Sequence, residues 1–408
     1  MENNMKKNVI WNTLGTGLNA FISLFLMIMI TRINGLNDAG IFSFSFSMAC
    51  LLYMIGIYAG RIYQVTDTTN ISNKEFIANR ALTCIIMILL TIMFLLVKRY
   101  SIYKTTIFMF LSIYKAIEAF SDVLYGIMQK EEKLENAGKS YFIKSLLTIF
   151  IFLIVDLLTH SLILSCVSIV IATVAVTLLY DLNIVTKLTS LKEKINYSNV
   201  NKILKEGFIV FVITFITVFM VNIPKYVIDQ YLSDEIQAIF GIIIMPATVI
   251  SLFSQFIIHP VLTTITKLCN KNNYVELKKL MYKIMLMIFV IGLICSFCGY
   301  LIGIPVLELV YGVDLKIYRI NLFVILIAST ISATAGIISP FLIAMRHNLS
   351  QLFIGISLVI IETILCFALI KEYSINGACI AYLISMIYNF ILFYIVSIRK
   401  INKKIKGV

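Results

Sequence analysis

The stretch ALTCIIMILLTIMFLLV, residues 81–97, contains no charged side chain and lies between Arg80 and Lys98. A helix of about 20 residues crosses the ~30 Å hydrocarbon core of a bilayer and satisfies its own backbone hydrogen bonds. About eleven other stretches resemble it in length and apolarity, so the sequence predicts an all-α integral membrane protein with about twelve transmembrane helices. The predicted spans are 8–32, 39–63, 80–97, 105–128, 141–159, 161–183, 207–228, 236–265, 284–304, 319–345, 350–370 and 374–397.

The composition fits a chain with little mass outside the lipid. Of the 408 residues, 60% are hydrophobic and only 13% are charged, and the net charge is +13. With a cytoplasmic N-terminus, 25 Lys and Arg fall on the inner side, among them Arg61, Arg80 and Lys144, and 8 fall on the outer side. This asymmetry predicts a multi-pass protein of the bacterial cytoplasmic membrane with both termini inside. It explains the basic charge without a nucleic-acid partner. The apolar stretch 8–30 is too long for the apolar region of a cleaved signal peptide, so the first helix is expected to remain in the membrane.

The longest inner gap, around 186–206, predicts a linker between two halves. The predicted lobes are 1–190 and 207–408, joined by a cytoplasmic linker at 191–206. Short internal matches support a repeat: GIF at 40–42 corresponds to AIF at 238–240, and GIMQK at 126–130 to IAMRH at 343–347. Six helices in each half predict parallel repeats, that is, two six-helix lobes around a central cavity.

Polar side chains inside the spans are the main functional signal, because an ionisable group at the bilayer centre costs about 2.5–3.5 kcal/mol on insertion scales. The span 105–128 places several polar groups within an arc of roughly 80°. Two interpretations remain open, the wall of a hydrated cleft and a buried ion-pair network that joins helices, and the number of polar groups favours the cleft. The residues are Lys115, Glu118, Asp122, Tyr125 and Gln129.

Three other ionisable residues inside the predicted spans each allow two interpretations. Arg61 is either a topology anchor at the inner end of its span or a planar donor for phosphate oxygens. Glu362 is either a proton or cation site or a partner for a nearby Lys or hydroxyl. The His259 imidazole is either a switch near neutral pH or a structural group. Three prolines in the second half, Pro224, Pro246 and Pro340, predict bends in their helices. These bends are candidate gating elements.

The first span carries a polar stripe beside two glycines, Gly15 and Gly17. Small and polar residues mediate close helix contacts in lipid, so helix packing and cavity lining are equally good interpretations. The stripe consists of Asn12, Thr16, Asn19 and Ser23.

The sequence contains no Walker A motif, nucleophile elbow or dense zinc-ligand cluster. We therefore expect a non-enzymatic protein with no catalytic residues, no metal and no cofactor, apart from H⁺ or Na⁺ as a coupling ion. The outer gaps are short, so no external catalytic domain is expected.

Several motifs resemble those of the Wzx-type polysaccharide-biosynthesis flippases of the multidrug/oligosaccharidyl-lipid/polysaccharide (MOP) exporter superfamily. They are KNVIWNTLG (7–15), DAGIFS (38–43), GRIYQVTD (60–67), YGIMQK (125–130) and NGACIAY (376–382). The resemblance spans nearly the whole chain in length, helix number and helix order.

The resemblance implies a MATE-like fold that moves an undecaprenyl-diphosphate-linked oligosaccharide across the membrane by alternating access. It also implies a basic cavity, which matches Arg32 and Arg61 in the first lobe and, more weakly, Lys225 and Arg319 in the second. Lys115, Tyr125 and Gln129 complete the predicted substrate-binding set. The acids Glu118, Asp122 and Glu362 depart from a purely basic cavity and are candidates for sugar contacts or a coupling ion.

The expected partners are the lipid-linked oligosaccharide, membrane lipids, a polysaccharide polymerase and glycosyltransferases. The product would be capsule, teichoic acid or exopolysaccharide. One alternative is a cation-coupled multidrug antiporter of the same superfamily, which would depend on the acids rather than the bases. A membrane polysaccharide polymerase fits less well, because such an enzyme needs a sizeable outer loop.

Overall fold

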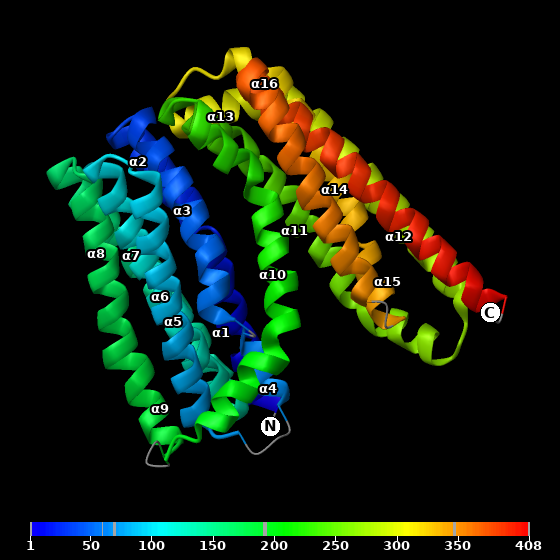
Figure 1. The fold of residues 1–408 in the computed structure, drawn as a ribbon, viewed down its shortest axis with the longest axis horizontal. Coiled ribbons are helices and arrows are strands. Elements are labelled where there is room, and N and C mark those ends of the chain that lie inside the picture. The colour runs from blue at the N-terminus through cyan, green and yellow to red at the C-terminus, as the bar shows by residue number, and fades with distance from the viewer. Residues whose placement is uncertain (1, 59, 68–70, 191–193, 346–347, 407–408) are drawn as a thin grey trace. The chain divides into compact units, whose positions relative to one another are not determined.

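The computed structural model describes residues 2–58, 60–67, 71–190, 194–345 and 348–406. Within these ranges the chain folds into helices and contains no β-strand, as Figure 1 shows. It divides into two compact units, Met1–Val218 and Phe219–Val408, each of which is described by itself. The prediction of an all-α protein is confirmed.

The first unit consists of long apolar helices joined by short turns. Its elements are α1 (Glu2–Ala20), α2 (Ile22–Ile33), α3 (Leu36–Ile57), α4 (Gly60–Thr66), α5 (Asn73–Lys98), α6 (Ile102–Lys130), α7 (Leu134–Thr159), α8 (Leu162–Val176), the π-helix η1 (Thr177–Leu182), α9 (Asn183–Leu188) and the first part of α10 (Tyr197–Tyr231).

The second unit contains the end of α10 and the remaining helices. These are α11 (Asp234–Asn270), α12 (Tyr274–Cys298), the π-helix η2 (Gly299–Gly303), α13 (Ile304–Tyr311), the 3₁₀ turn η3 (Lys316–Tyr318), α14 (Arg319–Gly336), α15 (Ile338–Ala344) and α16 (Asn348–Ile405).

The number of membrane crossings agrees with the sequence pattern. In the described residues, ten helical segments are long and apolar enough to cross a membrane. The last of them divides at Ser374, whose φ of 53° and ψ of −133° break α16 into two helices. The 29-residue α6 adds a twelfth crossing that is long enough but carries charged residues at its centre. The chain is thus a multi-pass membrane protein with about twelve transmembrane helices, as predicted.

The ends of α5 follow from its flanking residues. Ser72 forms a capping box, in which its side chain accepts a hydrogen bond from the Glu75 N–H while the Glu75 carboxylate accepts one from the Ser72 N–H. This arrangement satisfies two backbone donors at the helix start. At the other end Arg99 adopts a left-handed conformation with φ of 52° and terminates the helix.

Glycines allow α1 to pack closely against α7. A Cβ atom on Gly15 would collide with the carbonyl of Gly138, and one on Gly138 would collide with the backbone of Trp11. Small residues permit such close contact in lipid. For Gly15, the packing interpretation of the first span is therefore confirmed.

The start of α10 packs within the first unit. The Tyr58 hydroxyl donates to the Leu204 carbonyl at 2.8 Å, and the Tyr58 ring stacks on Phe211 with centroids 4.9 Å apart. Asn199 Nδ2 donates to both carboxylate oxygens of Glu75 at 3.0 Å. Residues 197–206 of the predicted linker are thus helical and held by α3 and α5, while the predicted lobe boundaries stay a prediction.

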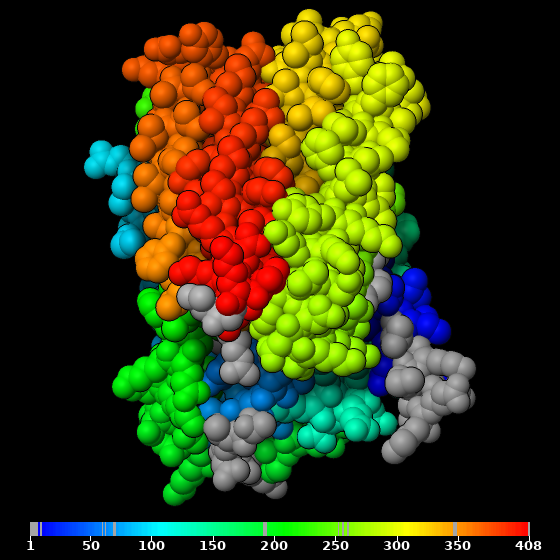
Figure 2. Space-filling model, turned by 90° about the vertical axis from the view of Figure 1, so that its right-hand side faces the viewer, coloured from blue at the N-terminus to red at the C-terminus, as the bar shows by residue number. Residues whose placement is uncertain are grey.

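In the second unit α12 and the end of α16 lie side by side, as Figure 2 shows. Lys278 Nζ donates to Asn402 Oδ1 at 2.9 Å, and the hydroxyls of Tyr282 and Tyr394 lie 3.1 Å apart. These polar contacts join the two helices near one end of the unit.

Candidate functional site

The polar face of α6 is packed inside the first unit against α3, α5, α7 and α8. Three ion pairs lie at this face. Lys115–Glu118 is within α6 and Arg80–Asp122 joins α5 to α6. Lys144–Asp181 joins α7 to η1, and Lys144 is also hydrogen-bonded to an α6 side chain. We call these three pairs the ion-pair ladder. All six side chains are at most 14% exposed, so the ladder lies in the interior of the unit.

The first pair of the ladder lies among aromatic rings. Lys115 Nζ contacts Glu118 Oε2 at 2.6 Å, and the Tyr114 hydroxyl donates to Glu118 Oε1 at 2.9 Å. Lys115 Nζ also lies 4.7 Å from the ring centroid of Phe46 and 5.1 Å from that of Tyr114. Cation–π contacts of this kind stabilise a desolvated ammonium, so both charges of the pair are compensated locally.

The second pair joins α5 to α6. Arg80 Nη2 lies 3.2 Å from Asp122 Oδ2, and Arg80 Nη1 donates to the Ala119 carbonyl at 3.2 Å. Arg80 is only 4% exposed. The Arg80 side chain thus crosses to α6 inside the unit, and its assignment to the inner side of the membrane stays a prediction.

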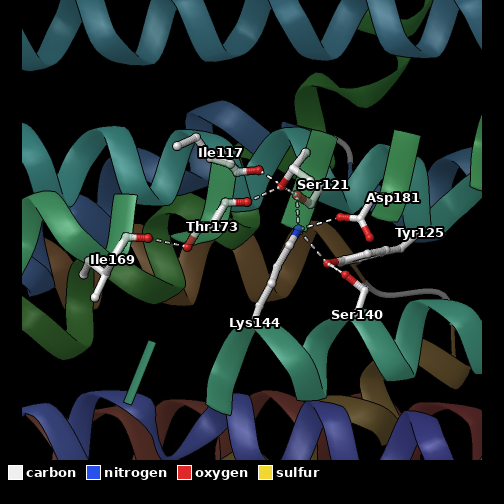
Figure 3. Close-up of polar contacts among 9 residues, drawn as sticks. Ile117, Ser121, Tyr125, Ser140, Lys144, Ile169, Thr173 and Asp181 are labelled. Atoms are coloured by element: carbon white, nitrogen blue, oxygen red, sulfur yellow. Dashed lines mark hydrogen bonds and ion pairs between the residues drawn. The ribbon is translucent and has the colours of Figure 1, made fainter. Parts of the chain in front are cut away.

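The third pair forms the densest polar cluster, which Figure 3 shows. Lys144 Nζ donates to Asp181 Oδ2 at 2.6 Å, to Ser121 Oγ at 2.6 Å and to the Tyr125 hydroxyl at 3.0 Å. The Tyr125 hydroxyl and Ser140 Oγ lie 2.9 Å apart. All three ammonium protons of Lys144 thus have an acceptor inside the unit, and its assignment to the inner side of the membrane stays a prediction.

A π-helix places Asp181 opposite Lys144. The segment η1 (Thr177–Leu182) interrupts the span between α8 and α9, and it directs both Thr177 and Asp181 into the unit. Thr177 Oγ1 lies 3.1 Å from Ser121 Oγ, which ties η1 to α6. Single π-helical turns are rare and often occur at functional sites.

Arg61 is the second residue of α4 and follows Gly60. Gly60 has a φ of 70°, a left-handed conformation that suits glycine. Arg61 is half-buried, and its Nη1 is shielded from solvent without a hydrogen-bond partner in the described part of the chain. The neighbouring Gln64 is buried, with Nε2 donating to the Val123 carbonyl at 3.1 Å. No ion pair of the ladder includes Arg61.

The other predicted substrate-binding residues belong to several helices of the two units. Arg32 is exposed at the end of α2, and Gln129 is half-buried near the end of α6. Lys225 is half-buried in α10, and Arg319 is exposed at the first residue of α14. Of the predicted binding set, the structure brings Lys115 and Tyr125 into the polar interior of the first unit, and the roles of all these residues remain predictions.

The predicted bends differ from one proline to another. The span containing Pro340 is interrupted between α14, which ends at Gly336, and α15, which begins at Ile338. Gly336 is four residues before Pro340, where the proline ring clashes with a helical carbonyl. Helices α10 and α11 continue through Pro224 and Pro246. The side chain of His259 lies outside the described part of the structure.

Glu362 is the most isolated acid in the described residues of the second unit. It is 0% exposed, and neither carboxylate oxygen has a hydrogen-bond partner among the residues described. An ionised carboxylate buried without a partner is very unfavourable, so Glu362 remains a candidate for a proton or cation site. The described residues contain no group of three His, Cys, Asp or Glu that could bind a metal.

Sequence reasoning missed Lys144, Arg80 and Asp181 as interior residues. Arg80 and Lys144 lie close to the inner ends of their predicted spans, where topology explains a basic residue equally well. A pairing signal did exist, because Asp181 is an acid inside the apolar stretch 161–183 and requires a cation.

No protein-family model matches the chain. In an alignment of 403 positions that covers 96% of this chain and 98% of the relative, the chain is 24% identical to the capsular polysaccharide biosynthesis protein CapF of Staphylococcus aureus. This similarity extends from one end of the chain to the other.

Solved structures share the fold. The lipid II flippase MurJ in an inward closed conformation matches with a TM-score of 0.71 and 13% identity, covering 97% of this chain and 90% of that one. An inward-facing MATE multidrug transporter of the MOP superfamily matches with a TM-score of 0.62 and 13% identity, covering 99% and 95%. The Vibrio cholerae MATE transporter VcmN matches with a TM-score of 0.57 and 11% identity, covering 99% and 98%.

These comparisons confirm the resemblance inferred from the motifs. The chain is a multi-pass membrane protein with the fold of the MOP superfamily, and it is related over its whole length to a capsular polysaccharide biosynthesis protein.

Proposed function

We propose that the chain is a flippase for an undecaprenyl-diphosphate-linked oligosaccharide repeat unit. It moves this lipid from the inner to the outer leaflet of a bacterial cytoplasmic membrane by alternating access, with both chain termini in the cytoplasm. The polymer assembled outside is capsule, teichoic acid or exopolysaccharide. The full-length similarity to CapF and the fold shared with the flippase MurJ support this substrate class.

Arg61 is the observation that carries the proposal. Glu118, Asp122 and Asp181 each have their own cation in the ladder, whereas Nη1 of Arg61 has no partner in the described part of the chain. A diphosphate bears about two negative charges and cannot cross hydrocarbon without compensation. A guanidinium with an unpartnered N–H group offers hydrogen bonds to phosphate oxygens, and its planar geometry suits bidentate binding.

A gene deletion tests this proposal. Cells that lack the chain should accumulate sugar-loaded polyprenyl diphosphate in the inner leaflet, where it is shielded from an external glycosidase. Re-expression of the chain should make the lipid accessible and restore polymer. Accumulation of the sugar-free carrier instead would place the chain before the flipping step and contradict the proposal.

The acids of the ladder give a graded prediction. We expect Glu118→Gln and Asp122→Asn to reduce polymer yield less than Arg61→Ala does, because an amide oxygen still accepts from the hydrogen-bond donors of the pair. Polymer yield per folded transporter, quantified by fluorescence-detected size exclusion, measures the effect. Complete loss of polymer in either variant at normal expression would show that the acids participate directly.

Glu362 supports a second candidate, a cation-coupled multidrug antiporter. In this candidate Glu362→Gln leaves thermal stability unchanged or raised, since the neutral amide resembles a protonated carboxyl, and abolishes the dependence of drug efflux on a proton gradient. The same change at the exposed Glu372 of α16 is the matched control. Proteoliposomes with an imposed pH gradient provide the measurement.

The two candidates differ in substrate. The antiporter would expel cationic dyes from proteoliposomes in a Glu362-dependent manner, whereas the flippase would move only the lipid-linked sugar. We expect no dye efflux. Efflux that disappears in Glu362→Gln but survives in Arg61→Ala would favour the antiporter.

A further inference from the structure

Lysine side chains gather at one end of the second unit, where α11 ends, α12 begins and α16 ends. The hydrogen bond from Lys278 Nζ to Asn402 Oδ1 joins α12 to α16 there, and the two helices lie side by side in Figure 2. We call the nine lysines of these helix ends the lysine surface. They are Lys267, Lys271, Lys278, Lys279, Lys283, Lys400, Lys403, Lys404 and Lys406.

The charge of the lysine surface is not balanced by acids. Glu276 is the one acidic residue in the stretches 267–283 and 400–406, and it pairs with Lys279 at 3.0 Å. The turn between α6 and α7 differs, since residues 130–139 contain three lysines and three glutamates. The orientation of a membrane helix depends on its Lys and Arg and little on its acids. Topology therefore explains why lysines occur at this end of the unit, but not why acids are so few.

The lysine surface begins where the lipid-facing part of α12 ends. The hydroxyls of Tyr282 and Tyr394 lie 3.1 Å apart between α12 and α16, and tyrosine is enriched at the membrane–water interface. From residue 284 to its end α12 contains no charged residue, and Leu286 is 65% exposed. Lys283 is exposed three residues before Leu286, on the same side of the helix. Its ammonium group thus lies at the level of the lipid headgroups, above a surface that contacts the acyl chains.

We propose that the lysine surface binds the headgroups of anionic phospholipids in the leaflet that it faces. Clusters of about four to eight basic residues beside a membrane-crossing helix are typical of segments that bind anionic lipids. An acidic protein would have to approach this level of the membrane, whereas phospholipids already surround it. The inference does not depend on the transported substrate, because it concerns the lipids around the second unit.

Native mass spectrometry of the full chain in detergent tests the proposal, with phosphatidylglycerol as the anionic probe and phosphatidylethanolamine as the zwitterionic one. The variant combines Lys283→Gln, Lys403→Gln and Lys404→Gln, at three exposed positions. We expect about 100-fold weaker binding of phosphatidylglycerol, since each lysine near an anionic surface contributes about a factor of five. Binding of phosphatidylethanolamine should not change. Arginine at the same three positions keeps the charge and should retain the affinity.

The matched control combines Lys133→Gln, Lys194→Gln and Lys205→Gln, at three exposed positions of the first unit. Each of these lysines is next to a glutamate in the sequence, so the affinity for phosphatidylglycerol should stay close to that of the wild type. Unchanged affinity in the lysine-surface variant would show that its lysines serve topology alone. Equal weakening in the control would show that binding follows the total charge of the chain. Either result overturns the inference.

Undecaprenyl diphosphate is the third probe, because it is also an anionic lipid. The proposed function assigns its diphosphate to Arg61, so its binding should be unchanged in the lysine-surface variant. Loss of undecaprenyl diphosphate together with phosphatidylglycerol would show that the lysine surface captures the transported lipid, which overturns the assignment to phospholipid. Failure of the wild type to bind undecaprenyl diphosphate, with phosphatidylglycerol bound as expected, would contradict the proposed function and leave this inference supported.

Discussion

Polymer assembly is expected to stop when Arg61 is replaced by alanine and to persist in part when it is replaced by lysine. Alanine removes the guanidinium whose Nη1 has no hydrogen-bond partner in the described part of the chain, so the diphosphate would enter hydrocarbon without this counter-ion. Lysine keeps the charge but loses the planar fork that matches two phosphate oxygens. The loss of charge-assisted hydrogen bonds, at about 1.5–3 kcal/mol each, corresponds to roughly a 10- to 150-fold change in binding.

The measurement is surface polysaccharide per folded transporter in complemented deletion cells. Arg399→Ala, at an exposed position of α16, removes the same side chain from the surface and should leave polymer at the wild-type level. A full yield from Arg61→Ala at normal expression would remove Arg61 from the mechanism. Equal loss in both substitutions of Arg61 would show that fork geometry matters as much as charge.

The membrane architecture was predictable because each span must satisfy its backbone within lipid, which forces an apolar run of fixed length. The same reasoning identified the α6 face, since Lys115, Glu118 and Asp122 recur at helical spacing in an otherwise apolar span. From the number of polar groups it favoured a wet cleft over an ion-pair network, because periodicity reports which residues share a face but not what packs against it. The short distances within the ladder support the network for these residues.

The partners of the ladder were harder to predict than its α6 members. The positive-inside rule assigns Lys144 and Arg80 to the inner ends of their spans, as it does for most basic residues there. Their long side chains allow them to reach α6 from those ends. The π-helix that brings Asp181 to Lys144 contains no glycine or proline that would have indicated it in the sequence. Such pairings depend on three-dimensional register, which a single sequence does not encode locally.

The Lys144–Asp181 pair should have the largest effect on stability. Removing one partner of a buried pair leaves an uncompensated charge and typically costs about 3–5 kcal/mol, whereas replacing both by apolar residues is often neutral. We therefore expect Lys144→Met and Asp181→Leu each to lower the melting temperature and the folded yield strongly. The double variant should recover much of the loss.

The pair Lys139–Glu135 on the same helix α7 is a natural control. Its atoms lie 3.8 Å apart, and its side chains are 34% and 25% exposed. Partly exposed pairs contribute about 0–1 kcal/mol, so Lys139→Met and Glu135→Leu should have small, nearly additive effects. Equal melting temperatures for Lys144→Met and Lys139→Met would contradict a ladder that is shielded from water and would imply that water reaches Asp181. A stable double variant without polymer would instead mean that the ladder serves transport as well as folding, because stability alone cannot account for that loss.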